Sequence, residues 1–263
     1  MWIYTCIGIF IGIILGLTGA GGGMLAVPAL VSSLGLSIQQ ASPIALIAVA
    51  GGSIIGAAQG LHQGLVRYKA AILMVLIGIP FSSIGISVSK ILPQRILFML
   101  FALIMICVSI RLLITLYKNS DALRTKLILG HVNPSNGKFY WTWSTGFFLG
   151  SIGALAGFTS GLLGIGGGFI IVPLLRRFTN VSMHAITATS LLVISLVSIA
   201  GVINALSHGI VIPIKITILF SIATIIGMLI GRKASMYISQ TYIQFGFALI
   251  LILNGIMMLV KNI

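Results

Sequence analysis

Residues 16–30 of the chain read GLTGAGGGMLAVPAL, and residues 161–175 read GLLGIGGGFIIVPLL. Each stretch has three consecutive glycines and then a proline five residues later, among apolar residues. Glycine permits backbone conformations with positive φ and lets the backbone approach a neighbour or a ligand closely. The two stretches therefore predict two copies of one structural unit, each interrupted by a glycine turn.

The two copies stay in register over most of the chain. The offset is 145 residues up to Gly64 and Gly209 and 146 residues from Gly85 and Gly231 onward. Matched pairs include Gly12/Gly157, Leu46/Leu191, Ser53/Ser198, Gly56/Gly201, Gln94/Gln240 and Phe101/Phe247. We therefore expect two homologous transmembrane repeats, 1–117 and 143–263, joined by a polar linker, 118–142.

The composition excludes a soluble globule. Hydrophobic residues make up 59% of the 263 residues and charged residues 6%, and the mean hydropathy is +1.22. Such a chain cannot cover itself with polar surface and needs the lipid bilayer as its solvent. Apolar runs of about the roughly 20 residues that span a bilayer occur at 43–61, 70–89, 96–117, 185–206 and 242–260.

We predict an all-α membrane protein, each repeat having a glycine-broken helical hairpin followed by three transmembrane helices. A straight helix through residues 2–35 would be about 50 Å long, well beyond the roughly 30 Å hydrocarbon core, so the chain is expected to double back at its glycines. Each repeat then has an odd number of segments, and the second repeat is inverted relative to the first.

The basic residues favour inverted repeats. Inversion places eleven of them on the linker side and four on the other, whereas parallel repeats would give nine against six. The eleven are Arg67, Lys69, Arg111, Lys118, Arg124, Lys126, Lys138, Arg176, Arg177, Arg232 and Lys233. Cytoplasmic loops carry the excess of Lys and Arg, so we predict a cytoplasmic linker and both termini outside.

The glycine turns have the features of an anion site. A helix that starts after such a turn presents unpaired N–H groups and a positive dipole end. A proline near the start of that helix removes a donor and disfavours helix just before it. In inverted repeats two such turns would meet near the midplane and hold a small anion. The predicted binding residues here are Gly21, Gly22, Gly23, Pro28, Gly166, Gly167, Gly168 and Pro173.

Polar residues in the second span of each repeat are further candidates, because amides and hydroxyls donate hydrogen bonds to an anion without a counter-charge. They are Ser42, Gln59, Thr187, Thr189, Ser190 and Asn204, with Gln59 and Asn204 at equivalent positions. The alternative is that they bond between helices. His62 and His208 could couple transport to protons, or they are ordinary interfacial histidines.

Other functional classes lack their signatures. The net charge of +14 would suggest nucleic acid in a soluble protein, but the basic residues here stand singly or in pairs at the ends of apolar runs, so no nucleic acid is expected. The single acid, Asp121, lies in the linker, and Cys6 and Cys107 have no metal-ligand spacing. We therefore expect no metal, no cofactor and no enzyme activity.

The doubled motif, Gly16 to Leu30 and Gly161 to Leu175, resembles the TauE/SafE sulfite exporter family. The likeness covers nearly the whole chain. It implies an inner-membrane transporter of sulfur-containing anions such as sulfite, sulfonates, sulfoacetate or thiosulfate, and members differ in substrate. The remaining alternatives are a non-transporting scaffold or maturation factor and a passive anion channel. A homodimer is possible for the transporter and for both alternatives.

Overall fold

The computed structural model describes residues 2–19, 22–117, 140–207, 209–210, 212–235 and 237–262. This part of the chain forms ten α-helices and no strand, which confirms the all-α prediction. The helices are α1 Trp2–Thr18, α2 Gly22–Leu34, α3 Ile38–His62, α4 Tyr68–Ile91, α5 Gln94–Tyr117, α6 Trp143–Leu163, α7 Gly168–Phe178, α8 Met183–Ser207, α9 Ile214–Ala234 and α10 Gln240–Asn262.

Each half of the chain contributes five helices in the same order. Seven helices are long and apolar enough to cross a membrane: α3, α4, α5, α6, α8, α9 and α10. By contrast, α2 and α7 have 13 and 11 residues, and at about 1.5 Å per residue they are too short for a roughly 30 Å core. Each half therefore begins with a helix and a short helix separated by glycines, and three long helices follow, as predicted.

The two halves interlock. Helix α1 packs along α9 of the other half and α6 packs along α4, while α3 crosses α8 and α5 lies against α10. Glycines make the first two contacts close: a Cβ on Gly157 would overlap the backbone of Gly78, and one on Gly12 would overlap the carbonyl of Thr224. Small residues allow such backbone contact between membrane helices. Each half is thus packed mainly against the other.

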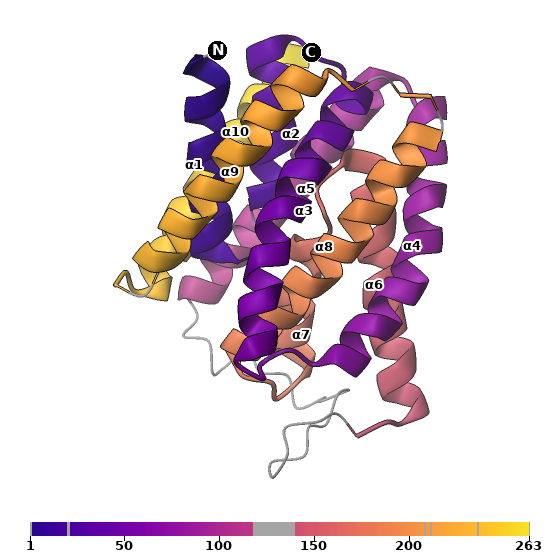
Figure 1. Cartoon of the computed structure of the whole chain (residues 1–263), viewed down its shortest axis with the longest axis vertical. Helices are drawn as coiled ribbons and strands as arrows, with labels where there is room; N and C mark the ends of the chain where they lie inside the picture. Colours follow the sequence, from indigo (N-terminus) through magenta and orange to yellow (C-terminus); the bar gives the residue numbers. More distant parts are fainter. Residues whose placement is uncertain are drawn as a thin grey trace.

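The direction of the helices is consistent with inverted repeats. Helix α1 begins and α10 ends at one end of the bundle, and α6 begins at the opposite end (Figure 1). Helix α5 ends at Tyr117, and α6 begins at Trp143 after Thr142, whose hydroxyl caps the helix. Residues 118–139 of the predicted linker, with Asp121, lie outside the described residues.

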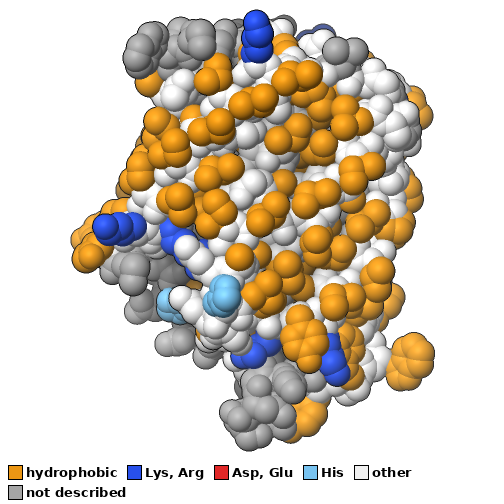
Figure 2. All heavy atoms as spheres, viewed as in Figure 1, with side chains coloured by type: hydrophobic (Ala, Val, Ile, Leu, Met, Phe, Trp, Pro, Cys, Tyr) orange, Lys and Arg blue, Asp and Glu red, His pale blue; other side chains and the backbone are white. Residues whose placement is uncertain are grey.

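The surface has the pattern of a lipid-exposed protein. In the view of Figure 2, hydrophobic side chains cover the middle of the face, and Lys and Arg side chains lie at the top, on the left side and near the bottom. Large apolar side chains such as Leu76 and Leu103 are about two-thirds exposed, at 65% and 64%. Lipid rather than water is the environment in which that exposure is favourable.

The interlocked packing predicts which glycines tolerate a side chain. Replacing Gly157 with Val should push α6 away from α4 and lower the melting temperature of the purified protein by about 5 °C or more, since overpacking costs typically 1–3 kcal/mol. The control is Gly146→Val in the same helix, because a Cβ there meets nothing within 4 Å. Equal melting temperatures for the two variants would contradict the close α4–α6 contact.

Candidate functional site

The glycine turns end α1 and α6 in the same way. Gly19 has φ +71° and Gly164 has φ +73°, and Gly166 and Gly167 also have positive φ. The N–H of Gly19 donates to the carbonyl of Leu15, and the N–H of Gly164 donates to that of Ser160, both at 2.8 Å. Glycine is the residue that adopts this left-handed conformation at little cost. Both helices therefore stop where the sequence predicts a turn.

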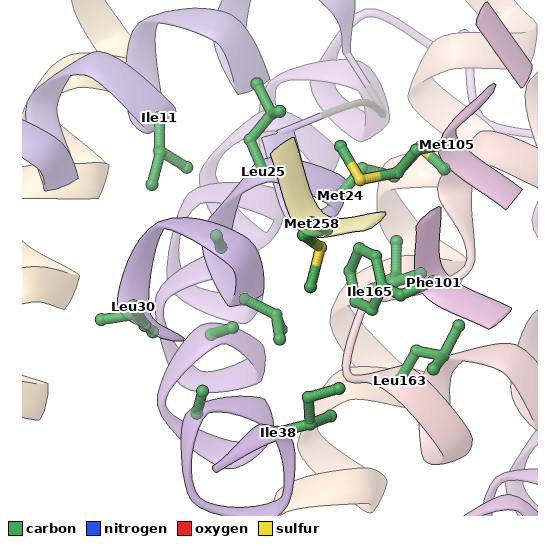
Figure 3. Packing of buried hydrophobic residues seen from close by; sticks show 14 of the residues in the cluster. Ile11, Met24, Leu25, Leu30, Ile38, Phe101, Met105, Leu163, Ile165 and Met258 are labelled. Atoms are coloured by element: carbon green, nitrogen blue, oxygen red, sulfur yellow. The ribbon is translucent and has the colours of Figure 1, made fainter. Parts of the chain in front are cut away.

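The two turns touch each other at the centre of the molecule. A Cβ on Gly23 would overlap the carbonyl oxygen of Ile165, which lies between Gly164 and Gly166. The side chain of Ile165 points away into a buried apolar cluster that includes Met24 of α2 and Phe101 of α5 (Figure 3). This anchor holds the second turn while its flanking glycines leave the backbone free to contact the first turn.

Each turn also contacts the second span of the other half. A Cβ on Gly19 would overlap Thr187 of α8, and a Cβ on Gly164 would overlap Ser42 of α3. These contacts are equivalent, because both pairs are related by the 145-residue offset. The structure thus brings two of the predicted polar residues, Ser42 and Thr187, to the turns.

A buried serine hydroxyl, that of Ser198, lies beside Gly166 of the second turn. A Cβ on Gly166 would lie 3.3 Å from Val49 and from Ile194, and 3.4 Å from the Oγ of Ser198. Ser198 and its equivalent on α3, Ser53, are fully buried, and neither hydroxyl has a hydrogen-bond partner. Serine in a helix normally bonds to a carbonyl of the preceding turn, so a buried hydroxyl without a partner needs an explanation such as a water or a ligand.

Sequence reasoning did not include these two serines among the site residues. Ser53 and Ser198 match at the repeat offset, and a hydroxyl kept at the same membrane position in both copies is the signal that could have found them. The hydroxyls of Ser42 and Ser160, close to the second turn, are likewise buried without a hydrogen-bond partner.

The short helices start at the turns, as predicted. Helix α2 starts at Gly22, and α7 starts at Gly168 with Gly167 as its N-cap and without a side-chain cap. The first N–H groups of such a helix have no partner within it. A Cβ on Gly22 or Gly167 would contact Leu15 or Ala156 of the preceding helix, so these two glycines also close the hairpins. Gly21 lies outside the described residues.

One expectation about the prolines is wrong. Pro28 and Pro173 lie inside α2 and α7, and each helix continues through its proline. A proline inside a helix lacks the N–H that would bond to the carbonyl four residues earlier, so the two prolines weaken bonding within the helices and do not prevent helix before them. Their part in binding stays a prediction.

Several other predicted residues lie away from the turns. Gln59 and His62 are exposed near the end of α3, so the structure does not bring Gln59 to the glycine turns. Asn204 is half-buried, and its backbone carbonyl accepts a bond from Ser207 at 2.8 Å. His208 is outside the described residues.

Thr189 and Ser190 have structural partners. The Oγ1 of Thr189 donates to the carbonyl of Ala185 at 2.6 Å and accepts from the backbone N–H of Arg67 at 3.0 Å. The hydroxyl of Ser190 donates to the carbonyl of Thr187 at 2.9 Å. Thr189 therefore holds the α3–α4 loop against α8, and neither hydroxyl resembles the unpartnered serines.

A small pocket lies beside the second turn. It has a volume of about 20 Å³ and is lined by Gln39, Ser42, Pro43, Leu46, Ile86, Ser89, Gly161, Gly201, Ala205 and Ile210. Roughly one water molecule fits such a volume. The helices around it, α3, α4, α6 and α8, would have to separate to admit a larger solute.

Seven helices that are long and apolar enough to cross a membrane, packed around two glycine turns, identify a multi-pass membrane protein. The family model described as "Sulfite exporter TauE/SafE" matches residues 4–258, and the chain belongs to this family.

Its relatives are named as transporters too. The chain is 27% identical to "Probable membrane transporter protein YunE" of Bacillus subtilis, over 90% of this chain and 88% of that protein. A "Probable membrane transporter protein" of Xylella fastidiosa is 26% identical over 76% of this chain and 72% of its own length. One from Methanocaldococcus jannaschii is 28% identical over 96% and 93%. No solved structure matches the chain.

The crossed contacts of the turns predict a graded effect of alanine. Gly164→Ala adds left-handed strain of about 1–3 kcal/mol and a clash with Ser42, whereas Gly64→Ala adds similar strain in open space. The melting temperature of the purified protein should fall clearly further for Gly164→Ala. Equal falls would mean that the second turn does not pack against α3.

Proposed function

We propose that the protein carries small sulfur-containing oxyanions, of the sulfite, sulfonate, sulfoacetate or thiosulfate class, across the cell inner membrane. The observation that carries this proposal is the meeting of two glycine turns beside buried, unpartnered serine hydroxyls from both halves. Backbone N–H groups at helix starts bind anions well, and the family description "Sulfite exporter" supports a sulfur-containing anion as the substrate.

The chemistry of the site suits a transported oxyanion. The described residues contain no Asp or Glu, so none of their side chains repels an anion as a carboxylate would. Hydroxyl and backbone N–H donors bind an oxyanion without forming an ion pair with it. Binding that is strong enough to admit a solute and weak enough to release it is what transport requires.

Alternating access fits the geometry better than a passive channel does. The turns are in contact, and the pocket beside them is about 20 Å³. An oxyanion therefore needs the central helices to move apart. In interlocked halves, rocking of one set of helices against the other would open the site to each side in turn. The proposed orientation has the linker in the cytoplasm and both termini outside.

The serine hydroxyls give the most specific test. In proteoliposomes, the double variant Ser53→Ala, Ser198→Ala should raise the KM for sulfite about tenfold or more, because a hydrogen bond to a charged group contributes roughly 1.5–3 kcal/mol. The fold should survive, since neither hydroxyl has a partner to lose.

Ser195→Ala is the matched control on α8. Ser195 is also buried, but its hydroxyl donates to the carbonyl of Leu192 at 2.8 Å, so its removal should leave the KM within about twofold. A double variant that keeps the wild-type KM would refute binding by these serines. Wild-type vesicles that carry no oxyanion of the four classes would instead refute the transport of these anions and favour the scaffold alternative.

A further inference from the structure

Arg232 is a cation turned into the protein. It lies in the last turn of α9, is half-buried, and its Nη1 donates to the carbonyl of Gly56 on α3 at 3.3 Å. A Cβ on Gly56 would lie 2.9 Å from Nη1 and 2.7 Å from Leu191 of α8. The next residue, Lys233, is exposed. A favourable interaction with the helix dipole would explain both cations at this helix end, but it does not explain why one of them points inward.

The other half of the protein has no cation at this place. The repeat offset of 146 residues matches Arg232 to Ile86, and Ile86 lines the small pocket together with Gly161 and Gly201. Those two glycines are the equivalents of Gly16 and Gly56, which lie beside Arg232. An apolar side chain therefore suffices for packing at this position, and the guanidinium breaks the symmetry of the repeat.

An arginine without a charged partner in this place is energetically unfavourable, which suggests that it has a function. The described residues include no carboxylate that could pair with it, and a charged group within a membrane helix bundle is usually functional. Guanidinium carries five N–H donors and binds oxyanions in a bidentate manner. Arg232 also stands about one helical turn from the first glycine turn, because Leu191 is four residues after Thr187 on α8.

We infer that Arg232 recognises the oxyanion at the mouth of the pathway on the linker side, where α9 ends, before the anion reaches the glycine turns. This inference rests on the proposed function and deepens it, because it names the residue that the anion contacts when it enters or leaves on the linker side. The bond to the Gly56 carbonyl holds the guanidinium in place between α3 and α9. A bound anion either replaces this carbonyl as the acceptor or accepts from the other N–H groups of the guanidinium.

The test compares neighbouring basic residues in proteoliposomes, with sulfite as the probe. Arg232→Gln should raise the KM for sulfite about tenfold or more, Arg232→Lys should give an intermediate KM because it keeps the charge but not the planar fork, and Lys233→Gln should stay within about twofold of wild type. Sulfite should raise the melting temperature of the purified wild-type protein, and this rise should shrink in Arg232→Gln and persist in Lys233→Gln.

The possible failures are distinguishable. Sulfite flux in the wild type with the same KM in Arg232→Gln and Lys233→Gln would overturn the role of Arg232 and leave the proposed function standing. A lower melting temperature without sulfite, reproduced by Asp121→Asn, would show that Arg232 is the structural partner of the single acid, which also overturns it. Absence of flux for all four anion classes in the wild type would overturn both proposals.

Discussion

Two glycine turns in contact with each other are the constraint on which the rest of the structure depends. Irregular backbone at membrane depth must be covered by protein, because lipid cannot bond to its N–H and C=O groups. Here the cover comes from the other half of the chain: Gly23 lies against the carbonyl of Ile165, Gly19 against Thr187, and Gly164 against Ser42. Each turn is therefore buried in part by the other half.

The same constraint explains the interlocked helices. Helices α1 and α6 end at the turns, so each is fixed against the half that covers its turn, α1 on α9 and α6 on α4. Glycines at these crossings bring the backbones together. The centre is then closed by equivalent residues of α3 and α8, with Val49 and Ile194 both beside Gly166 and the hydroxyl of Ser198 nearby. A protein built in this way can expose its centre only by moving helices, which is the property that a carrier needs.

Much of this could be predicted from the sequence, because the repeat is a one-dimensional signal. The constant offset between the two repeats predicts the same order of helices in both halves. The glycine motif predicts the helical hairpin at the start of each half. The contact between halves could not be predicted, since hydropathy gives the spans and not their neighbours. Polarity and its equivalence to Asn204 single out Gln59 in the sequence, but its side chain is exposed. Ser53 and Ser198 also match across the repeats, and the sequence does not show that their hydroxyls are buried without a hydrogen-bond partner. Arg232 was counted as a topology signal because sequence does not show which way it points.

Binding of the anion at the glycine turns can be tested directly by an experimental structure with selenite, a heavier analogue of sulfite whose selenium can be located by anomalous scattering. We expect a selenium peak between the two glycine turns, within hydrogen-bonding reach of the hydroxyls of Ser53 or Ser198 and of the first N–H groups of α2 or α7. Selenium bound elsewhere in the bundle, with the turns still in contact, would contradict a site formed by the glycine turns.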